Sequence, residues 1–298
     1  MFGSAKIKGG KMIKKELNIP MGTKLDLVAL AVKSRAIRCK ILSSGVPVTF
    51  KPVRYEVEGE ILTVLTGKIW TYRKTHYMSG VVLENRIDIP ALNLKPLEVT
   101  SMGEWDPAAD FWMDDEDPCK KYFKAILKHG KRDMFEMEQI IQYEDPDDPY
   151  TDPILEAAEC FADEDYDEAY KILEEVLVDD LRCLDAHAHL GNWEFNLTER
   201  HSEWSIDKAM RHYEVGLKIG EYSLGKNFKE VLPWRIINNR PFLRCLHGYG
   251  LSLCRLGHVK EAKRVFNRML WLNPEDNQGA RFLLAEIDAG RTFYESEV

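Results

Sequence analysis

Residue types that can do chemistry gather in one stretch of the chain, CLHGYGLSLCRLGH, from Cys245 to His258. Cysteine and histidine side chains bind zinc, a glycine-rich loop can hold phosphate, and a serine flanked by glycines can act as a nucleophile. Each of these chemistries needs its own residue spacing. The spacing therefore decides whether the stretch is a reactive site or a packed helix.

The spacing favours a packed helix. On a helix, Cys245 and Cys254 point to opposite sides. His247 and Cys254 share a face, but they lie about 10 Å apart along the helix axis. Zinc ligands lie ~2.0–2.3 Å from the metal, so this helix alone cannot build a tetrahedral site. The glycines match neither phosphate-loop motif, and Ser252 lacks the G-x-S-x-G motif. We therefore expect no metal, no cofactor and no catalytic residue here, and we interpret Gly250 as a residue that lets a second helix pack closely.

The composition is that of a globular protein. The chain has 298 residues, 45% hydrophobic and 30% charged, which suits roughly two ordinary domains. The apolar run 27–32 is far shorter than the ~20 residues that span a bilayer. The six cysteines are scattered, which is typical of a reducing compartment, so we expect a cytoplasmic protein that contacts no membrane. These cysteines are Cys39, Cys119, Cys160, Cys183, Cys245 and Cys254.

Charge is divided unequally along the chain. Residues 1–100 contain 17 Lys and Arg and 8 Asp and Glu. The remainder contains 24 Lys and Arg and 41 Asp and Glu, and the net charge of the whole chain is −8. Opposite signs in the two parts indicate separate modules that dock on each other or meet different partners.

The basic part divides into three segments. Residues 1–20 have no sustained hydrophobic period and several lysines, which indicates either a flexible basic arm or a segment that precedes the native start. Residues 23–42 place apolar side chains at roughly helical intervals and predict one amphipathic helix with a basic face. From Val46 to about Pro96, short runs rich in Val, Ile, Thr and aromatics predict a small antiparallel sheet or barrel. We expect the helix and the β-rich part to form one domain over residues 21–110.

An acidic region with helices is predicted between the two domains, over residues 111–151. Proline and aspartate interrupt the stretches 105–118 and 143–153, while the residues between them favour one or two helices. The run 114–117 lacks the alternating ligands and the glycine of an EF-hand loop, so we interpret it as a solvated linker.

Residues 152–298 are predicted to be all helical and contain a degenerate repeat. The segments DYDEAYKILEEVL, SIDKAMRHYEVGL and HVKEAKRVFNRML each place an alanine four residues before a larger apolar residue, and each follows a predicted partner helix. This pattern resembles the tetratricopeptide repeat (TPR) family over residues 152–286, although the units are spaced more widely than the family period of about 34 residues. The insertion 221–241 either decorates the binding face or packs Phe228 and Trp234 into the core. The residues that carry the resemblance are Ala157, Ala169 and Leu173, then Leu190, Gly191, Ala209, Tyr213 and Gly216, and then Leu246, Tyr249, Gly250, Leu253, Gly257, Ala262, Phe266 and Pro274.

The resemblance implies a curved solenoid whose concave face binds a peptide or helix of a partner protein. Arginines near asparagines on that face could receive an acidic peptide or a terminal carboxylate. The carboxylate clamp of chaperone-binding TPR proteins is not matched, because Ile154 and Ala158 stand where it needs Lys and Asn. The alternative is that the concave-face residues only pack on neighbouring helices. By resemblance, they are Arg244, His247, Leu251, Cys254 and Arg255 in the third unit, and Asp185, Ala188, Asn192, Phe195 and Asn196 in the second.

The basic part supports a second hypothesis, which is the binding of single-stranded nucleic acid. On a strand, alternation would place Trp70, Tyr72 and Lys74 on one face, where aromatics stack on bases and cations contact phosphates. Against this, aromatic side chains also suit a core, and the acidic half would repel a polyanion. The residues of this hypothesis are Lys68, Trp70, Tyr72, Arg73 and Lys74, extended by Lys33, Arg35, Arg38 and Lys40.

An unrecognised enzyme is the third possibility. The histidines His76, His187, His189 and His201 are potential bases, but none occurs in a recognisable catalytic spacing. We therefore expect a non-enzymatic cytoplasmic adaptor of the α+β class. Its small antiparallel, barrel-like N-terminal domain precedes an all-α, TPR-like helical-repeat domain that binds a protein or peptide partner.

Overall fold

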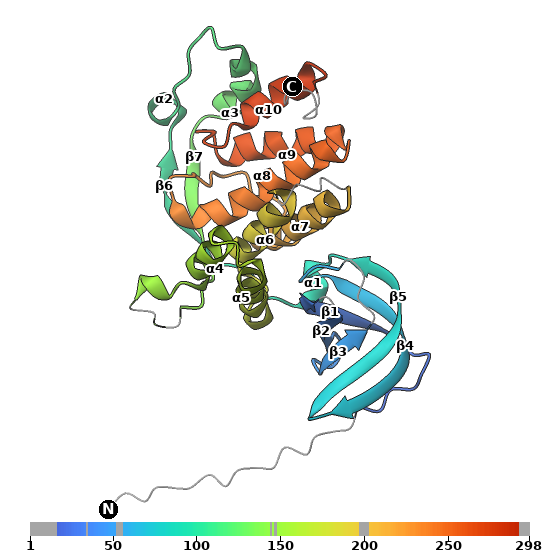
Figure 1. The fold of residues 1–298 in the computed structure, drawn as a ribbon. Coiled ribbons are helices and arrows are strands. Elements are labelled where there is room, and N and C mark those ends of the chain that lie inside the picture. The colour runs from blue at the N-terminus through green and yellow to red at the C-terminus, as the bar shows by residue number, and fades with distance from the viewer. Residues whose placement is uncertain are drawn as a thin grey trace, which may run out of the picture.

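The computed structural model describes residues 17–33, 35–51, 56–143, 145, 148–196 and 203–291. A closed β-barrel forms the N-terminal part, and a stack of helices forms the C-terminal part (Figure 1). The α+β class with two domains is therefore confirmed. Residues 1–16 of the arm that was predicted for residues 1–20 lie outside the described residues. Within the described ranges, no helix has the length and apolar character needed to cross a membrane.

Five strands close the barrel: β1 (Lys24–Lys33), β2 (Ala36–Ile41), β3 (Pro47–Lys51), β4 (Ile61–Tyr72) and β5 (Thr75–Arg86). Their order around the barrel is β1-β2-β3-β5-β4, and β3 and β5 are the parallel pair among otherwise antiparallel neighbours. Alternate side chains fill the interior, among them Leu27, Phe50 and Met78, which are fully buried. The barrel-like domain expected from the sequence is present, with one parallel pair that the sequence did not indicate.

The helix predicted for residues 23–42 is wrong, because this segment forms β1 and β2. Leu27 and Ala29 point into the barrel, whereas Val28 and Leu30 point outward into a core shared with the helical domain. A strand that is buried on both faces has a continuous apolar run instead of an alternating one. The two-residue period was therefore hidden, and apolar residues also fell at helical intervals.

The helices described in the C-terminal part are α4 (Pro153–Ala162), α5 (Tyr166–Asp179), α6 (Leu184–Asn196), α7 (Glu203–Leu224), α8 (Arg240–Arg255), α9 (Val259–Leu272) and α10 (Ala280–Asp288). They pack as the pairs α4–α5, α6–α7 and α8–α9, with α6 beside both α4 and α8 (Figure 1). The predicted helix pairs are confirmed. A Cβ atom at Gly250 would lie 2.5 Å from the ring of Phe266 on α9, so Gly250 does allow close packing of this pair. The stretch from Cys245 to His258 thus forms most of α8 and the turn at Gly257, whose φ is +79°.

The segment predicted as an acidic linker with one or two helices, 111–151, is folded against the helical domain. The expected helices are present up to His129, but the helix prediction beyond Gly130 is wrong, because residues 132–137 form a strand. The strands β6 (Val99–Trp105) and β7 (Arg132–Met137) form a two-stranded sheet, and the short helices α2 (Pro107–Asp110), η1 (Pro118–Phe123) and α3 (Lys124–His129) lie between them in the chain. Trp105, Phe123 and Met137 are buried in the same core as α8 and α9. The acidic residues stay at the surface and cap short helices; Asp117, for example, accepts a hydrogen bond from the backbone N–H of Cys119. The short helix η2 (Pro149–Thr151) then leads into α4.

The insertion 221–241 packs on this sheet. Val231 forms a parallel bridge with Met134, and the ring of Phe228 meets that of Phe135 edge-on at 5.5 Å. Trp234 packs against the core of the helical domain. Phe228 and Trp234 thus pack as one alternative expected, and the binding-face alternative stays open because the last turn of the insertion, η3 (Ile237–Asn239), also reaches a cavity between the helices.

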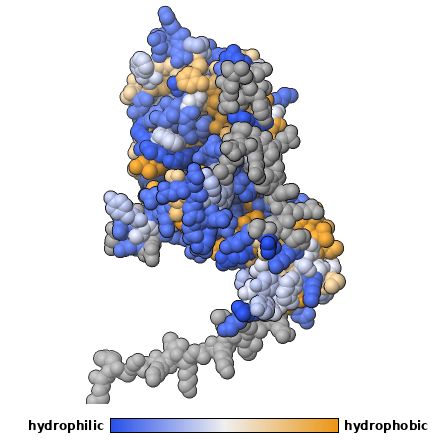
Figure 2. All heavy atoms as spheres, viewed as in Figure 1, coloured by the Kyte–Doolittle hydropathy of each residue, from blue (hydrophilic) through white to orange (hydrophobic). Residues whose placement is uncertain are grey.

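The barrel docks on the helical domain through β1 and the loop 56–60, and α1 (Ile89–Leu92) follows the barrel beside α7. Gly59 has a φ of +89°, and a Cβ atom there would lie 2.6 Å from Val215 of α7, so both backbone and space require glycine. Glu58 and Glu60 of this loop are buried and face His212 and Arg211 of α7. Away from this junction, the view of the helical domain in Figure 2 is largely hydrophilic with separate apolar patches.

Candidate functional site

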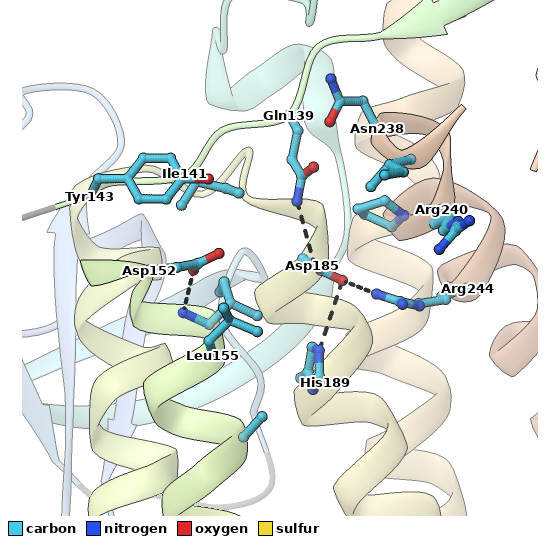
Figure 3. Close-up of a pocket in the computed structure, with 14 residues that line it drawn as sticks. Gln139, Ile141, Tyr143, Asp152, Leu155, Asp185, His189, Asn238, Arg240 and Arg244 are labelled. Atoms are coloured by element: carbon cyan, nitrogen blue, oxygen red, sulfur yellow. Dashed lines mark hydrogen bonds and ion pairs between the residues drawn. The ribbon is translucent and has the colours of Figure 1, made fainter. Parts of the chain in front are cut away.

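Two adjoining cavities open along the row of α4, α6 and α8. The first, of about 600 Å³, lies between these helices, η3 and the segment 139–143 that follows β7 (Figure 3). The second, of about 410 Å³, lies between α6 and α8 and reaches Tyr213 of α7. His189 and Arg244 line both cavities, so we treat the two together and call them the groove.

The groove collects most of the side chains that the repeat resemblance placed on a concave face. They come from the first helices of the three pairs, because residues three or four positions apart share one helix face. Whether they bind a partner stays a prediction. Ile154, Ala158 and Asp185 line the first cavity, and Ala188, Asn192, Phe195, Asn196, Arg244, His247 and Leu251 line the second.

Two of the predicted residues lie elsewhere. Cys254 is 7% exposed and belongs to the apolar core, where burial raises the pKa of its thiol to about 11. It follows Gly250 by four positions, so it shares the face of α8 that packs on α9. Arg255 lines neither cavity; its guanidinium lies 5.7 Å from the ring centroid of Phe195.

Arg244 lies where the two cavities meet and is held by Asp185. Its Nη1 donates to Asp185 Oδ1 at 2.9 Å, and Gln139 Nε2 donates to the other carboxylate oxygen at 3.5 Å (Figure 3). Nε2 of His189 lies 3.9 Å from Asp185 Oδ1. Burial lowers the pKa of His189, with Arg244 acting in the same direction and Asp185 against it, so the imidazole is neutral at pH 7.

A second arginine, Arg240, faces the first cavity one helical turn before Arg244 (Figure 3). The guanidinium groups of Arg240 and Arg244 lie 5.2 and 6.0 Å from the ring centroid of Trp234, and Arg240 Nε donates to the carbonyl of Trp234 at 3.1 Å. Cation–π contacts of this kind are worth ~0.5–1 kcal/mol at exposed sites and orient the guanidinium planes. Arg240 was not predicted from the sequence, and Trp234 was predicted only as a possible core residue. The spacing of four between Arg240 and Arg244 was the available signal.

Carboxamide side chains line part of the second cavity. Asn192 and Asn196 are exposed on α6, and Asn196 Nδ2 donates to the backbone and side-chain oxygens of Asn192 at 2.9 and 2.7 Å. Gln278 also lines this cavity, and its Nε2 donates to the carbonyl of Leu243 at 3.3 Å. Burial lowers the pKa of His247 to about 4, so this side chain is neutral. Arg244 is thus the permanently charged group among the residues that line this cavity.

The histidines considered as catalytic bases are dispersed. His187 is buried, with Nε2 3.0 Å from the carbonyl of Leu181, and burial lowers its pKa to about 4. His76 contacts Thr71 on the barrel, and His201 lies outside the described residues. In the part of the chain that the structure describes, no group of three or more His, Cys, Asp or Glu side chains could hold a metal ion.

The residues predicted to bind nucleic acid lie on the barrel, apart from the groove. Trp70, Tyr72 and Lys68 belong to β4, and Arg38 belongs to β2. Lys74 was expected on one strand face with Trp70 and Tyr72, which is wrong, because β4 ends at Tyr72. Arg73 and Lys74 form the turn, with φ values of +45° and +72°. Arg35 lies in the tight turn between β1 and β2, where Lys33 ends β1, and Lys40 is exposed on β2.

Comparison of the chain with protein-family models, curated proteins and solved structures found no match. The TPR resemblance therefore stays a prediction that rests on the helix pairs and their shared residues. The fold and the groove define a two-domain α+β protein in which a closed barrel is docked on stacked helix pairs.

Proposed function

We propose that this chain is an adaptor whose helical domain binds an extended peptide segment of a partner protein in the groove. The observation that carries the proposal is the pair of guanidinium groups that Trp234 holds at the wall of the first cavity. Guanidinium groups oriented in advance bind a carboxylate with little loss of side-chain entropy.

Arg244 can bind a ligand without giving up its structural role. Its Nη1 contacts Asp185, but a guanidinium has five donor hydrogens and the Arg244 side chain is 42% exposed. A second carboxylate, from an acidic side chain or a peptide C-terminus, can therefore bind Arg240 and Arg244 while Asp185 stays in place.

The second cavity suits the main chain of the same peptide. Carboxamides such as those of Asn192, Asn196 and Gln278 carry both donors and acceptors, which is what an extended backbone requires. The apolar side chains of Phe195 and Leu251 offer contacts for side chains of the peptide. The groove thus combines a cationic anchor for one carboxylate, Arg240 and Arg244, with polar and apolar contacts in the second cavity.

Selection of random linear peptides on the full-length chain tests the proposal. We expect enriched peptides to carry an acidic residue or a required free C-terminal carboxylate. The variant Arg240→Ala/Arg244→Lys removes both planar guanidinium groups but keeps a positive charge beside Asp185, and it should weaken these peptides roughly ten-fold.

The matched control is Arg264→Ala, because Arg264 is exposed on α9 and lines neither cavity. Peptide affinity should be unchanged in this variant. Selected peptides that bind the Arg240→Ala/Arg244→Lys variant as tightly as the wild type would contradict the proposal, provided that circular dichroism shows both variants folded.

A further inference from the structure

A row of side chains crosses four strands on the outside of the barrel. Arg38 of β2 pairs with Thr49 of β3, Thr49 pairs with Tyr77 of β5, and Tyr77 pairs with Trp70 of β4. Directly paired residues point to the same side of a sheet. The neighbouring positions in the same strands, such as Phe50 and Met78, fill the barrel interior, so this row points outward. With strands about 4.8 Å apart, the row spans about 14 Å.

Exposed cations flank this row on β2, β3 and β4, three of the four strands that it crosses. Lys40 lies two positions beyond Arg38, and Lys51 places its Nζ 5.9 Å from the ring centroid of Tyr77. The sequence contains no Asp or Glu from Leu27 to Lys51 or from Ile61 to Leu83. The local field is therefore of one sign. We call this surface the barrel face: Arg38, Lys40, Thr49, Lys51, Lys68, Trp70, Tyr72, Arg73, Lys74 and Tyr77.

Aromatic rings lie among these cations. Trp70 and Tyr77 stack with centroids 5.4 Å apart and planes 10° from parallel, and both rings are partly exposed. Tyr72 is 56% exposed near the tip of the β4–β5 hairpin, with Arg73 5.3 Å from its ring centroid. An exposed aromatic beside a cation is the combination on which an unpaired base stacks while its phosphate is neutralised.

The described residues of the acidic helical domain do not cover the barrel face. The barrel meets that domain through the outward side chains of β1 and through the loop 56–60, whereas the barrel face lies on β2, β3, β5 and the hairpin end of β4. Figure 1 shows β3 and the β4–β5 hairpin on the part of the barrel that extends away from the helices. The net negative charge of the C-terminal part therefore does not block a polyanion at this surface.

We infer that the barrel face binds single-stranded nucleic acid. The cations contact the phosphates, and the aromatic rings stack on bases that are accessible only when they are unpaired. In a duplex the bases are already stacked on each other, so the aromatic contacts would be lost. This activity goes beyond peptide binding in the groove and uses a separate surface.

Fluorescence anisotropy of the full-length chain with labelled oligo-dT and oligo-U tests the inference, with a duplex of equal length as comparison. We expect the single strands to bind more tightly than the duplex. The double variant Arg38→Glu/Lys40→Glu should lose at least ten-fold in affinity, and Tyr72→Ala should lose roughly five-fold or more through stacking.

The control is Lys260→Glu/Arg264→Glu, which makes the same change in net charge at exposed positions of α9 and should leave binding unchanged. The N-terminal lysines stay intact in every variant, so a loss in Arg38→Glu/Lys40→Glu isolates the barrel face. Three results would overturn the inference: no salt-dependent affinity for the oligonucleotides, equal losses in both double variants, or binding to anionic lipid vesicles without binding to oligonucleotides.

Discussion

The groove and the barrel face both present arginines beside aromatic rings, but they hold them differently. In the groove, Arg244 is paired with Asp185, and Trp234 orients it together with Arg240. On the barrel face, Arg38 and Lys40 are exposed, and the described residues place no carboxylate within ion-pair distance of them. Two oriented arginines, one of them paired with a carboxylate, select a ligand by its geometry. Cations without a nearby carboxylate attract polyanions in general. The same residue types thus support a selective site in one domain and an electrostatic surface in the other.

Salt should separate the two surfaces most strongly. If about four cations of the barrel face contact phosphates, affinity for an oligonucleotide should fall roughly 50-fold between about 50 and 200 mM salt. Peptide affinity in the groove should fall only a few-fold, because one anionic group is bound there. Titrations of both ligands over this range measure the two slopes. Equal slopes would show that the groove is no more selective than the barrel face.

A methyl group added at the wall of the second cavity should weaken peptide binding and leave oligonucleotide binding unchanged. A Cβ atom at Gly248 would lie 2.2 Å from Cζ of Tyr213, and both residues line this cavity. We expect Gly248→Ala to lower the free energy of unfolding by about 1–3 kcal/mol through overpacking, and to weaken peptide binding. Urea denaturation measures the first effect and peptide titration the second. Oligonucleotide affinity within two-fold of the wild type is expected, and an unchanged urea midpoint would contradict the packing argument.

The junction between the two domains should respond to pH. Burial raises the pKa of Glu174 on α5 to about 7, with Glu58 adding to the rise and Lys33 opposing it. A carboxyl whose pKa is higher in the folded state stabilises the fold below its unfolded pKa, near 4.5, and this stabilisation is lost as the pH rises through 7. The variant Glu174→Gln, which cannot ionise, should match the wild type near pH 4.5. At pH 8 it should be more stable by on the order of 1–2 kcal/mol.

Urea midpoints at the two pH values measure this difference. Glu175→Gln removes an exposed carboxylate from the next position of α5 and serves as the control for the change in net charge. A Glu174→Gln effect of the same size at both pH values would contradict the assignment of the pH dependence to this carboxyl. Burial also lowers the pKa of His212, which makes the fold more stable as the pH rises. This contribution is the same in the wild type and in Glu174→Gln, so it cancels in the comparison.

The helical domain could be predicted because its signals are local. Alanines such as Ala209 and Ala262 recur with a fixed offset to a larger apolar residue, and both are fully buried between paired helices. The TPR resemblance supplied residues of the groove, and they lie together because positions three or four apart on one helix share a face. Cys254 shows the limit, because the resemblance did not indicate which side of α8 packs on α9.

The missed features depend on contacts that are distant in the sequence. β1 was mistaken for a helix because the helical domain buries its outer face as well. The sheet of β6 and β7 was missed because three short helices separate its strands in the chain. Trp234 was known to be a possible packing residue, but its contact with Arg240 and Arg244 arises only when the insertion folds back on α8.

The central claim is that two separate surfaces bind two kinds of ligand. Titration of two variants with both ligands tests it most directly. The groove variant Arg240→Ala/Arg244→Lys and the barrel-face variant Arg38→Glu/Lys40→Glu are each titrated with a selected peptide and with oligo-dT. We predict that each variant loses its own ligand by roughly ten-fold and keeps the other within two-fold. A variant that loses both ligands together, or a pair of variants that keeps both, would contradict the account.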